Sequence, residues 1–244
     1  AMAAGCDVEH VLNWSQQPDT AEQILAAGLP LIRFSHAHNN ALICQRVDFP
    51  LSHYRNQHVR LLIRDPRDVL VSPFFNETQR YQRFHGSIDE FVRFDCTATD
   101  SASKSARYGI HAIVRYLNAW SEHRSSFASF NVLAYEDLRA AHSRCLRAFL
   151  ASCDITLNDE LVADAIEYGS IDNMRRLETT GELNWHGLSG SSSPNGMKVR
   201  AGVVGSHKVQ LDPDTLAFIE DVLIHDLDPA FERYRTAALP QSAA

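Results

Sequence analysis

The stretch from Arg64 to Ser72 combines residue types that bind anions. Its sequence is Arg-Asp-Pro-Arg-Asp-Val-Leu-Val-Ser, and it directly follows a short apolar run. Asp65 is a favourable N-cap and Pro66 suits the first helical position, so a helix is predicted to begin beside the Arg64 guanidinium. Free N–H groups at a helix start and an arginine together favour a phosphate group, to which Ser72 adds a hydroxyl. The alternative is an ordinary capped helix in which Arg64 pairs with Asp68.

A second stretch, from Arg200 to Lys208, has the sequence Arg-Ala-Gly-Val-Val-Gly-Ser-His-Lys. Gly202 and Gly205 allow backbone N–H groups to approach an anion closely, and the two basic residues add positive charge. The alternative is an irregular loop that precedes a helix beginning near Asp212. The chain contains neither Gly-x-x-x-x-Gly-Lys-Ser/Thr nor Gly-x-Gly-x-x-Gly, which argues against a Walker A loop and against a dinucleotide-binding loop.

The composition is that of a soluble globular protein. The chain has 244 residues, of which 45% are hydrophobic and 22% charged, so one large domain over residues 1–244 is expected. The net charge of -7 argues against nucleic acid as a partner, and no apolar run is long enough for insertion into a membrane. The five cysteines are an odd number without a Cys-x-x-Cys pair, which favours a reduced, cytoplasmic protein.

Short apolar runs alternate with longer segments of helical periodicity. Strands are predicted over residues 29–35, 59–64 and 131–135, each covered on both faces, and helices over 66–82, 106–123, 137–153 and 212–224. This alternation predicts an α/β fold with a parallel sheet flanked by helices and a mostly helical C-terminal third. Residues 1–28 are predicted to form a helical segment, and the Ser/Gly-rich residues 189–196 a mobile loop.

The motifs occur in a recognisable order along the chain. Phe34-Ser35-His36 comes first, then the Arg64–Ser72 stretch, then Tyr135-Glu136-Asp137-Leu138, and finally Arg200-x-Gly-x-x-Gly-x-x-Lys. Over about residues 28–235 this order resembles the sulfotransferase family that uses 3'-phosphoadenosine 5'-phosphosulfate (PAPS). The resemblance implies a three-layer fold like that of P-loop nucleotide transferases. It also implies transfer of a sulfuryl group to a hydroxyl or amine of a small molecule, with adenosine 3',5'-bisphosphate as the product.

The resemblance assigns nucleotide-binding roles residue by residue. It implies these cofactor-binding residues: Arg64, Ser72, Tyr135, Arg200, Ala201 and Gly202. In the family the strand arginine and the helix serine hold the 3'-phosphate of the donor. The late arginine and glycine close over the same phosphate, and the tyrosine lies near the adenosine.

His36 is the predicted catalytic residue. Sulfuryl transfer needs a base that takes the acceptor's proton, and a neutral histidine suits that task near pH 7. The family places such a histidine in Lys-Thr-His or a variant, but here the lysine is absent. Arg33 stands one position earlier and would point to the opposite face of the strand. His36 and His38 also suggest a metal pair, but no further ligand cluster accompanies them, so no metal is expected.

The family's donor-sulfate turn, a Lys/Arg-Ser-Gly-Thr-like sequence, does not occur in the 35 residues before His36. We therefore expect either that the chain begins after this turn or that the protein lacks it, with weak nucleotide binding and slow or no sulfate transfer. One alternative function is a non-catalytic relative that binds adenosine phosphates or a protein partner. A nucleotide kinase is disfavoured by the missing Walker lysine. The sequence leaves the acceptor unspecified and a homodimer open.

Overall fold

The computed structural model describes residues 51–95, 109–182 and 202–236, together with residues 22, 25, 26, 28, 30, 32, 49, 197 and 199. The chain divides into two compact units, one of residues 1–36 and 137–177 and one of residues 37–136 and 178–244. The predicted loop over 189–196 lies outside the described residues, as does nearly all of the predicted segment 1–28 and of the strand 29–35. The single domain over residues 1–244 stays a prediction.

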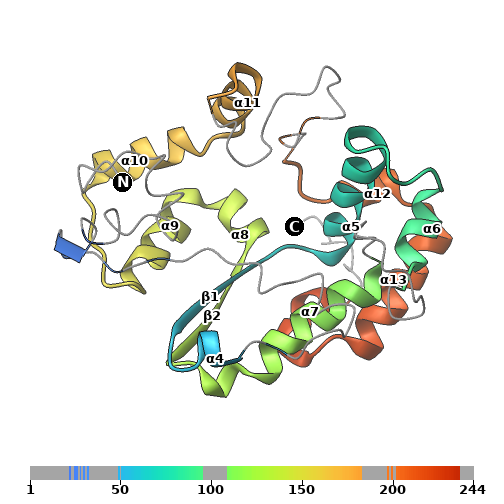
Figure 1. The fold of residues 1–244 in the computed structure, drawn as a ribbon, viewed down its shortest axis with the longest axis horizontal. Coiled ribbons are helices and arrows are strands. Elements are labelled where there is room, and N and C mark those ends of the chain that lie inside the picture. The colour runs from blue at the N-terminus through green and yellow to red at the C-terminus, as the bar shows by residue number, and fades with distance from the viewer. Residues whose placement is uncertain are drawn as a thin grey trace, which may run out of the picture. The chain divides into compact units, whose positions relative to one another are not determined.

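The second unit contains both described strands and most of the described helices (Figure 1). Its elements are α4 (Leu51–Tyr54), β1 (His58–Ile63), α5 (Pro66–Phe75), the π-helix η3 (Asn76–Arg80), α6 (Ile88–Arg93), α7 (Ile110–Glu122), the 3-10 helix η4 (Arg124–Ser126), β2 (Ser129–Ala134), α12 (His207–Gln210), α13 (Pro213–Asp226), the 3-10 helix η7 (Pro229–Phe231) and α14 (Glu232–Arg235).

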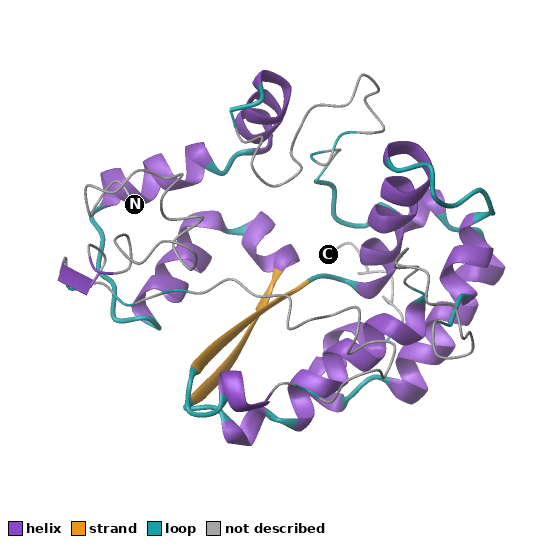
Figure 2. Cartoon of the chain, viewed as in Figure 1, coloured by secondary structure: helices purple, strands orange, loops and turns teal. Residues whose placement is uncertain are grey.

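The two strands are parallel neighbours, as Figure 2 shows. His58 pairs with Ser129 and Ile63 with Ala134, so the strands run in register over their whole length. A parallel pair requires a crossover, which α5 to η4 provide between them. The predicted parallel sheet with flanking helices is therefore confirmed. The predicted burial on both faces is wrong at Leu62, which is 59% exposed because the buried side chains of β1 all lie on the opposite face. It is also wrong at Val132 of β2, which is 39% exposed.

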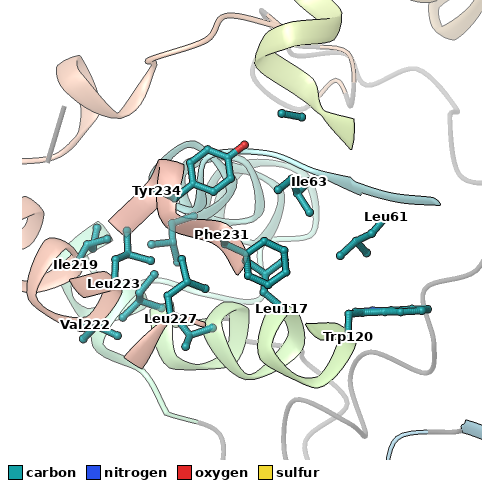
Figure 3. Packing of buried hydrophobic residues seen from close by; sticks show 14 of the residues in the cluster. Leu61, Ile63, Leu117, Trp120, Ile219, Val222, Leu223, Leu227, Phe231 and Tyr234 are labelled. Atoms are coloured by element: carbon teal, nitrogen blue, oxygen red, sulfur yellow. The ribbon is translucent and has the colours of Figure 1, made fainter. Parts of the chain in front are cut away.

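The hydrophobic core of this unit forms between β1, α7 and the C-terminal helices. Figure 3 shows Leu61 and Ile63 of β1 on the side of the strand that faces α7, and Leu117 and Phe231 belong to the same core. The amphipathic pattern predicted for α7 holds, since Ile110, Val114, Leu117 and Trp120 are all buried. From α13 the core receives Ile219, Val222 and Leu223. This core fixes the strands and helix starts that carry the candidate site.

Two predicted helices are interrupted. The helix predicted over 66–82 contains Pro73, which removes a backbone donor, and α5 gives way at Asn76 to the wider π-helix η3. The helix predicted over 137–153 breaks at Ala141, whose φ of -149° and ψ of 62° lie outside the helical region. Alanine is the strongest helix former, so no local signal marks this break. Tyr135, predicted to end a strand, instead begins a helix.

The first unit is built from helices. They are α8 (Tyr135–Ala140), whose first two residues belong to the second unit, α9 (His142–Ala151), α10 (Asp159–Tyr168) and α11 (Ile171–Thr180), which crosses into the second unit at Glu178. α9 packs against α10, whose Val162 is buried. These helices with α12 to α14 confirm the predicted helical C-terminal third.

Gly109 provides a test of the fold. It is the N-cap of α7, and a Cβ built on it would lie 1.8 Å from the carbonyl oxygen of Phe94. We expect Gly109→Ala to lower the free energy of unfolding by about 2–3 kcal/mol, because backbone must move to relieve the clash. Gly169→Ala is the control, since its nearest contact would be 3.4 Å. Equal losses in the two variants by urea unfolding would contradict this packing.

Candidate functional site

Arg64 lies at the junction of β1 and α5. β1 ends at Ile63, and α5 begins at Pro66 with Asp65 as its N-cap. The Asp65 carboxylate accepts a hydrogen bond of 2.9 Å from the backbone N–H of Arg67, which satisfies one of the open donors of the helix start. The predicted order of strand end, arginine, cap and proline is therefore present at the junction of β1 and α5.

The Arg64 guanidinium is held on three sides. Nη2 donates to the carbonyl oxygen of Val203 at 2.7 Å and to Asp68 Oδ2 at 3.2 Å. The Tyr135 ring lies against it, with 4.9 Å from Cζ to the ring centroid, which is a cation–π distance. Its Nε is buried and has no hydrogen-bond partner among the described residues. The predicted Arg64–Asp68 pair is therefore present. The Nε donor of the same guanidinium has no partner among the described residues.

Asp68 is the most densely bonded side chain of the site. Its carboxylate is completely buried and accepts from the backbone N–H groups of Gly205 (2.7 Å) and His207 (3.0 Å) and from the Ser206 hydroxyl (3.0 Å). It also contacts His207 Nδ1 at 2.8 Å. An ionised carboxylate only accepts, so Nδ1 is the protonated nitrogen in this contact.

The pKa of Asp68 reflects two opposing effects. Burial by itself raises the pKa, because it disfavours the charged form. The hydrogen bonds from His207 and Gly205 and the charge of Arg64 outweigh burial, and they hold the pKa far below the ordinary aspartate value. Asp68 is therefore ionised at every pH at which the protein is expected to work.

The segment from Gly202 to His207 lies over the start of α5 through these bonds. Gly205 has a φ of +81°, a left-handed conformation that glycine adopts without strain, and this turn directs its N–H to Asp68. At the other end of the segment, the Tyr135 hydroxyl donates to the carbonyl oxygen of Gly202 at 3.3 Å. The stretches around residues 64, 135 and 202, predicted separately, are therefore in direct contact.

Glu136 joins the end of β2 to the start of α5. Its carboxylate accepts from the Asp65 backbone N–H at 2.8 Å and from the Tyr234 hydroxyl at 2.7 Å. Burial and Glu136 both raise the pKa of Tyr234, so its hydroxyl keeps the proton that it donates. The buried Arg67 donates to Asp65 and approaches Glu220 at 3.8 Å. These contacts fix the position of the helix start independently of Asp68.

Ser72 lies on the same face of α5 as Asp68, four residues further along. It is partly buried, and its hydroxyl makes no hydrogen bond to the described residues. Arg200 and Ala201 lie outside the described residues, as do Arg33, His36 and His38. The structure therefore brings together Arg64, Tyr135 and Gly202 from the predicted set.

Sequence analysis missed several residues that build this site. His207 and Ser206 lie inside a stretch that was singled out for its glycines and its charges, and Glu136 lies inside the Tyr-Glu-Asp-Leu motif. The bonds from the Glu136 and Asp68 carboxylates to distant backbone N–H groups have no local signature in the sequence. Tyr234 follows the last predicted helix, and no pattern in the sequence around it indicates a role in the site.

The parts of the chain described by the structure contain no cluster of three or more histidine, cysteine or acidic residues that could hold a metal ion. In the same parts, none of the helices combines the length and apolar character needed to cross a membrane.

The comparisons with known proteins agree with these motifs. A family model described as the sulfotransferase domain matches residues 50–228, so the chain belongs to that family. The crystal structure of mouse sulfotransferase SULT7A1 complexed with PAP shares the fold, with a TM-score of 0.52 and 17% sequence identity. That match covers 69% of this chain and 58% of the mouse chain. No curated protein matches the sequence.

Substitution of Asp68 tests the network. We expect Asp68→Asn to lower the free energy of unfolding at pH 7 by about 2–4 kcal/mol, because an amide cannot accept from all the donors and leaves Arg64 uncompensated. The folded-state pKa is depressed, so this stabilisation is present above the pKa of the unfolded chain, about 4, and is lost as pH falls below it.

Urea unfolding at pH 7, 4 and 3 measures both effects. The difference between the parent protein and Asp68→Asn should shrink as the pH falls. Asp221→Asn is the control, because the Asp221 side chain is 73% exposed and pairs only across one turn with His225. A difference that stays constant down to pH 3 would show that the charge of Asp68 does not hold the segment.

Proposed function

We propose that this chain binds the 3'-phosphoadenosine group of PAPS and of adenosine 3',5'-bisphosphate at the start of α5. Arg64 and Ser72 would contact the 3'-phosphate, the Arg200–Gly202 stretch would close over it, and Tyr135 would lie near the adenosine. This assignment combines the family membership with the chemistry of the residues at the β1–α5 junction.

The buried Nε of Arg64, which has no hydrogen-bond partner among the described residues, carries this proposal. An unpaired donor in the interior is costly, and native structures seldom leave one without a partner or a function. Arginine presents its donors in a planar fork that suits phosphate oxygens. The fork is already oriented by the Val203 carbonyl and the Tyr135 ring, so little side-chain freedom remains to be lost on binding.

Ser72 supports the same ligand. Its hydroxyl has no partner among the described residues and lies on the face of α5 that also carries Asp68. Hydroxyls and guanidinium groups are common partners of phosphate, whereas the acidic side chains nearby are all occupied by donors of the protein. The groups left to bind a ligand are therefore the donors of Arg64 and Ser72.

The proposed reaction moves a sulfuryl group to a hydroxyl or amine of a small molecule. His36 takes the proton of the acceptor as its oxygen or nitrogen forms a bond to sulfur. The bond between sulfur and the 5'-phosphate oxygen breaks, and adenosine 3',5'-bisphosphate leaves with the electron pair. This assignment of His36 rests on its place in the Phe34-Ser35-His36 motif.

Nucleotide binding tests the first part of the proposal. We expect adenosine 3',5'-bisphosphate to bind more tightly than 5'-AMP, because only the bisphosphate carries a 3'-phosphate. Arg64→Ala should weaken binding of the bisphosphate by about 2–4 kcal/mol, the range for losing a buried charge-assisted contact. It should hardly change the affinity for 5'-AMP. Arg64→Lys should recover only part of this, because lysine lacks the fork.

Arg115→Ala is the matched control for calorimetry, since Arg115 is also partly buried and paired with a carboxylate, Asp95, in the same unit. Equal affinities of the parent protein for the two nucleotides would overturn the proposed site.

Turnover tests the second part. With PAPS and a panel of phenols, alcohols, sugars and amines, His36→Ala should lower kcat by about 10²- to 10⁴-fold, the span for a positioned base. The affinity for adenosine 3',5'-bisphosphate should not change. His38→Ala is the control and should leave kcat unaltered. Damage by His38→Ala instead would move the base by two residues. Nucleotide binding without any turnover would agree both with the missing donor-sulfate turn and with the non-catalytic alternative.

A further inference from the structure

Glu178 is a buried charged residue that the proposed nucleotide site does not use. It lies in α11, and its side chain is 0% exposed. Its Oε1 accepts from Nη1 of Arg80 at 3.2 Å, and its Oε2 accepts from the backbone N–H of Val199 at 2.9 Å. The carboxylate therefore joins two segments that are far apart in sequence.

Both segments lead directly to the candidate site. Arg80 is the last residue of η3, which continues α5, the helix that begins beside Arg64 and carries Asp68 and Ser72. Val199 immediately precedes Arg200 and lies three residues before Gly202. Glu178 thus connects the far end of the α5–η3 helix to the beginning of the segment that lies over its start.

The other end of this segment is bound to the same helix. Asp68 of α5 accepts from the backbone N–H groups of Gly205 and His207. Residues 199 and 205–207 are therefore both held by buried carboxylates, the first through Glu178 and Arg80 and the second through Asp68. Anchoring at two points lowers the conformational freedom of the chain between them, which favours a defined position of Val199 and Gly205 relative to α5.

We propose that Glu178 is a positioning residue for the 3'-phosphate site, which it serves by holding the Val199 backbone in place relative to the α5–η3 helix. This proposal rests on the proposed nucleotide-binding function. Glu178 would influence binding at that site without touching the ligand. Loss of the Glu178 carboxylate would free the chain before Gly202 while the Asp68 contacts remain.

A buried ion pair alone would not support this role, as the neighbouring Glu77 shows. Glu77 also belongs to η3, is 5% exposed, and accepts from Nε and Nη2 of Arg83 at 2.9 and 2.5 Å. Its carboxylate contacts none of residues 202–207 and not Val199. Glu77→Ala is therefore a control that also removes a buried, arginine-paired carboxylate, but one without a bond to the segment.

The first measurement is hydrogen exchange of the Val199 amide in the protein without nucleotide. Glu178→Ala should accelerate this exchange by about tenfold, the change expected from losing one buried hydrogen bond, and Glu77→Ala should leave it unchanged. Glu178→Gln should stay close to the parent, because its amide oxygen can still accept from Val199. Unchanged exchange in Glu178→Ala would overturn the proposal.

The second measurement is the ratio of the dissociation constants of 5'-AMP and adenosine 3',5'-bisphosphate. Glu178→Ala should reduce this ratio by about tenfold through weaker binding of the bisphosphate, and Glu178→Gln should restore most of it. Glu77→Ala should lower the melting temperature without changing the ratio. A Glu178→Ala protein that loses thermal stability but keeps the parent ratio would show that Glu178 is only a structural ion-pair residue.

Two further outcomes remain decisive. If Glu178→Ala does not fold, Glu178→Asp takes its place, since it keeps the charge near Arg80 but is one methylene too short to span both partners. If the parent protein shows no preference for the bisphosphate, the proposed function fails. The exchange of Val199 then still decides whether Glu178 holds the segment, because that readout needs no nucleotide.

Discussion

The buried carboxylate of Asp68 is the contact on which the candidate site depends. A charge placed in the interior is unfavourable unless its lone pairs are filled, and here backbone N–H groups, a hydroxyl, a histidine and Arg64 fill them. A strand end, a helix start and a loop 139 residues away meet at this one side chain. Because all these donors compensate the same charge, we expect their contributions to stability to be coupled. The loss of one donor then also weakens the contacts of the others.

Two further carboxylates act in the same way, and all three bind main-chain N–H groups of distant segments. Asp68 accepts from residues 205 and 207, Glu136 accepts from residue 65, and Glu178 accepts from residue 199. Backbone donors are present whatever side chain a position carries, so the anchored segments can change sequence without losing their anchor. This is consistent with a fold shared with a solved sulfotransferase at 17% identity.

The result of this anchoring is a guanidinium of fixed orientation. The Val203 carbonyl and the Tyr135 ring hold Arg64 from two directions, and the segments that carry them are themselves held by Asp68 and Glu136. An arginine on an unsupported surface would lose side-chain entropy on meeting a phosphate, whereas this one has already lost it during folding. The helix start and the arginine are therefore already oriented in the way that the proposed phosphate site requires.

The local sequence determined the elements that carry the site. The Asp65-Pro66 helix start, the end of β1 before Arg64, the apolar face of α7 and the Asp212 cap of α13 all depend on interactions within a few residues. Only the tertiary structure decided the break at Ala141 and the long-range partners of Asp68, Glu136 and Glu178. Those contacts join residues from 21 to 139 positions apart, and they form because buried charges need donors, which no local pattern of residues specifies.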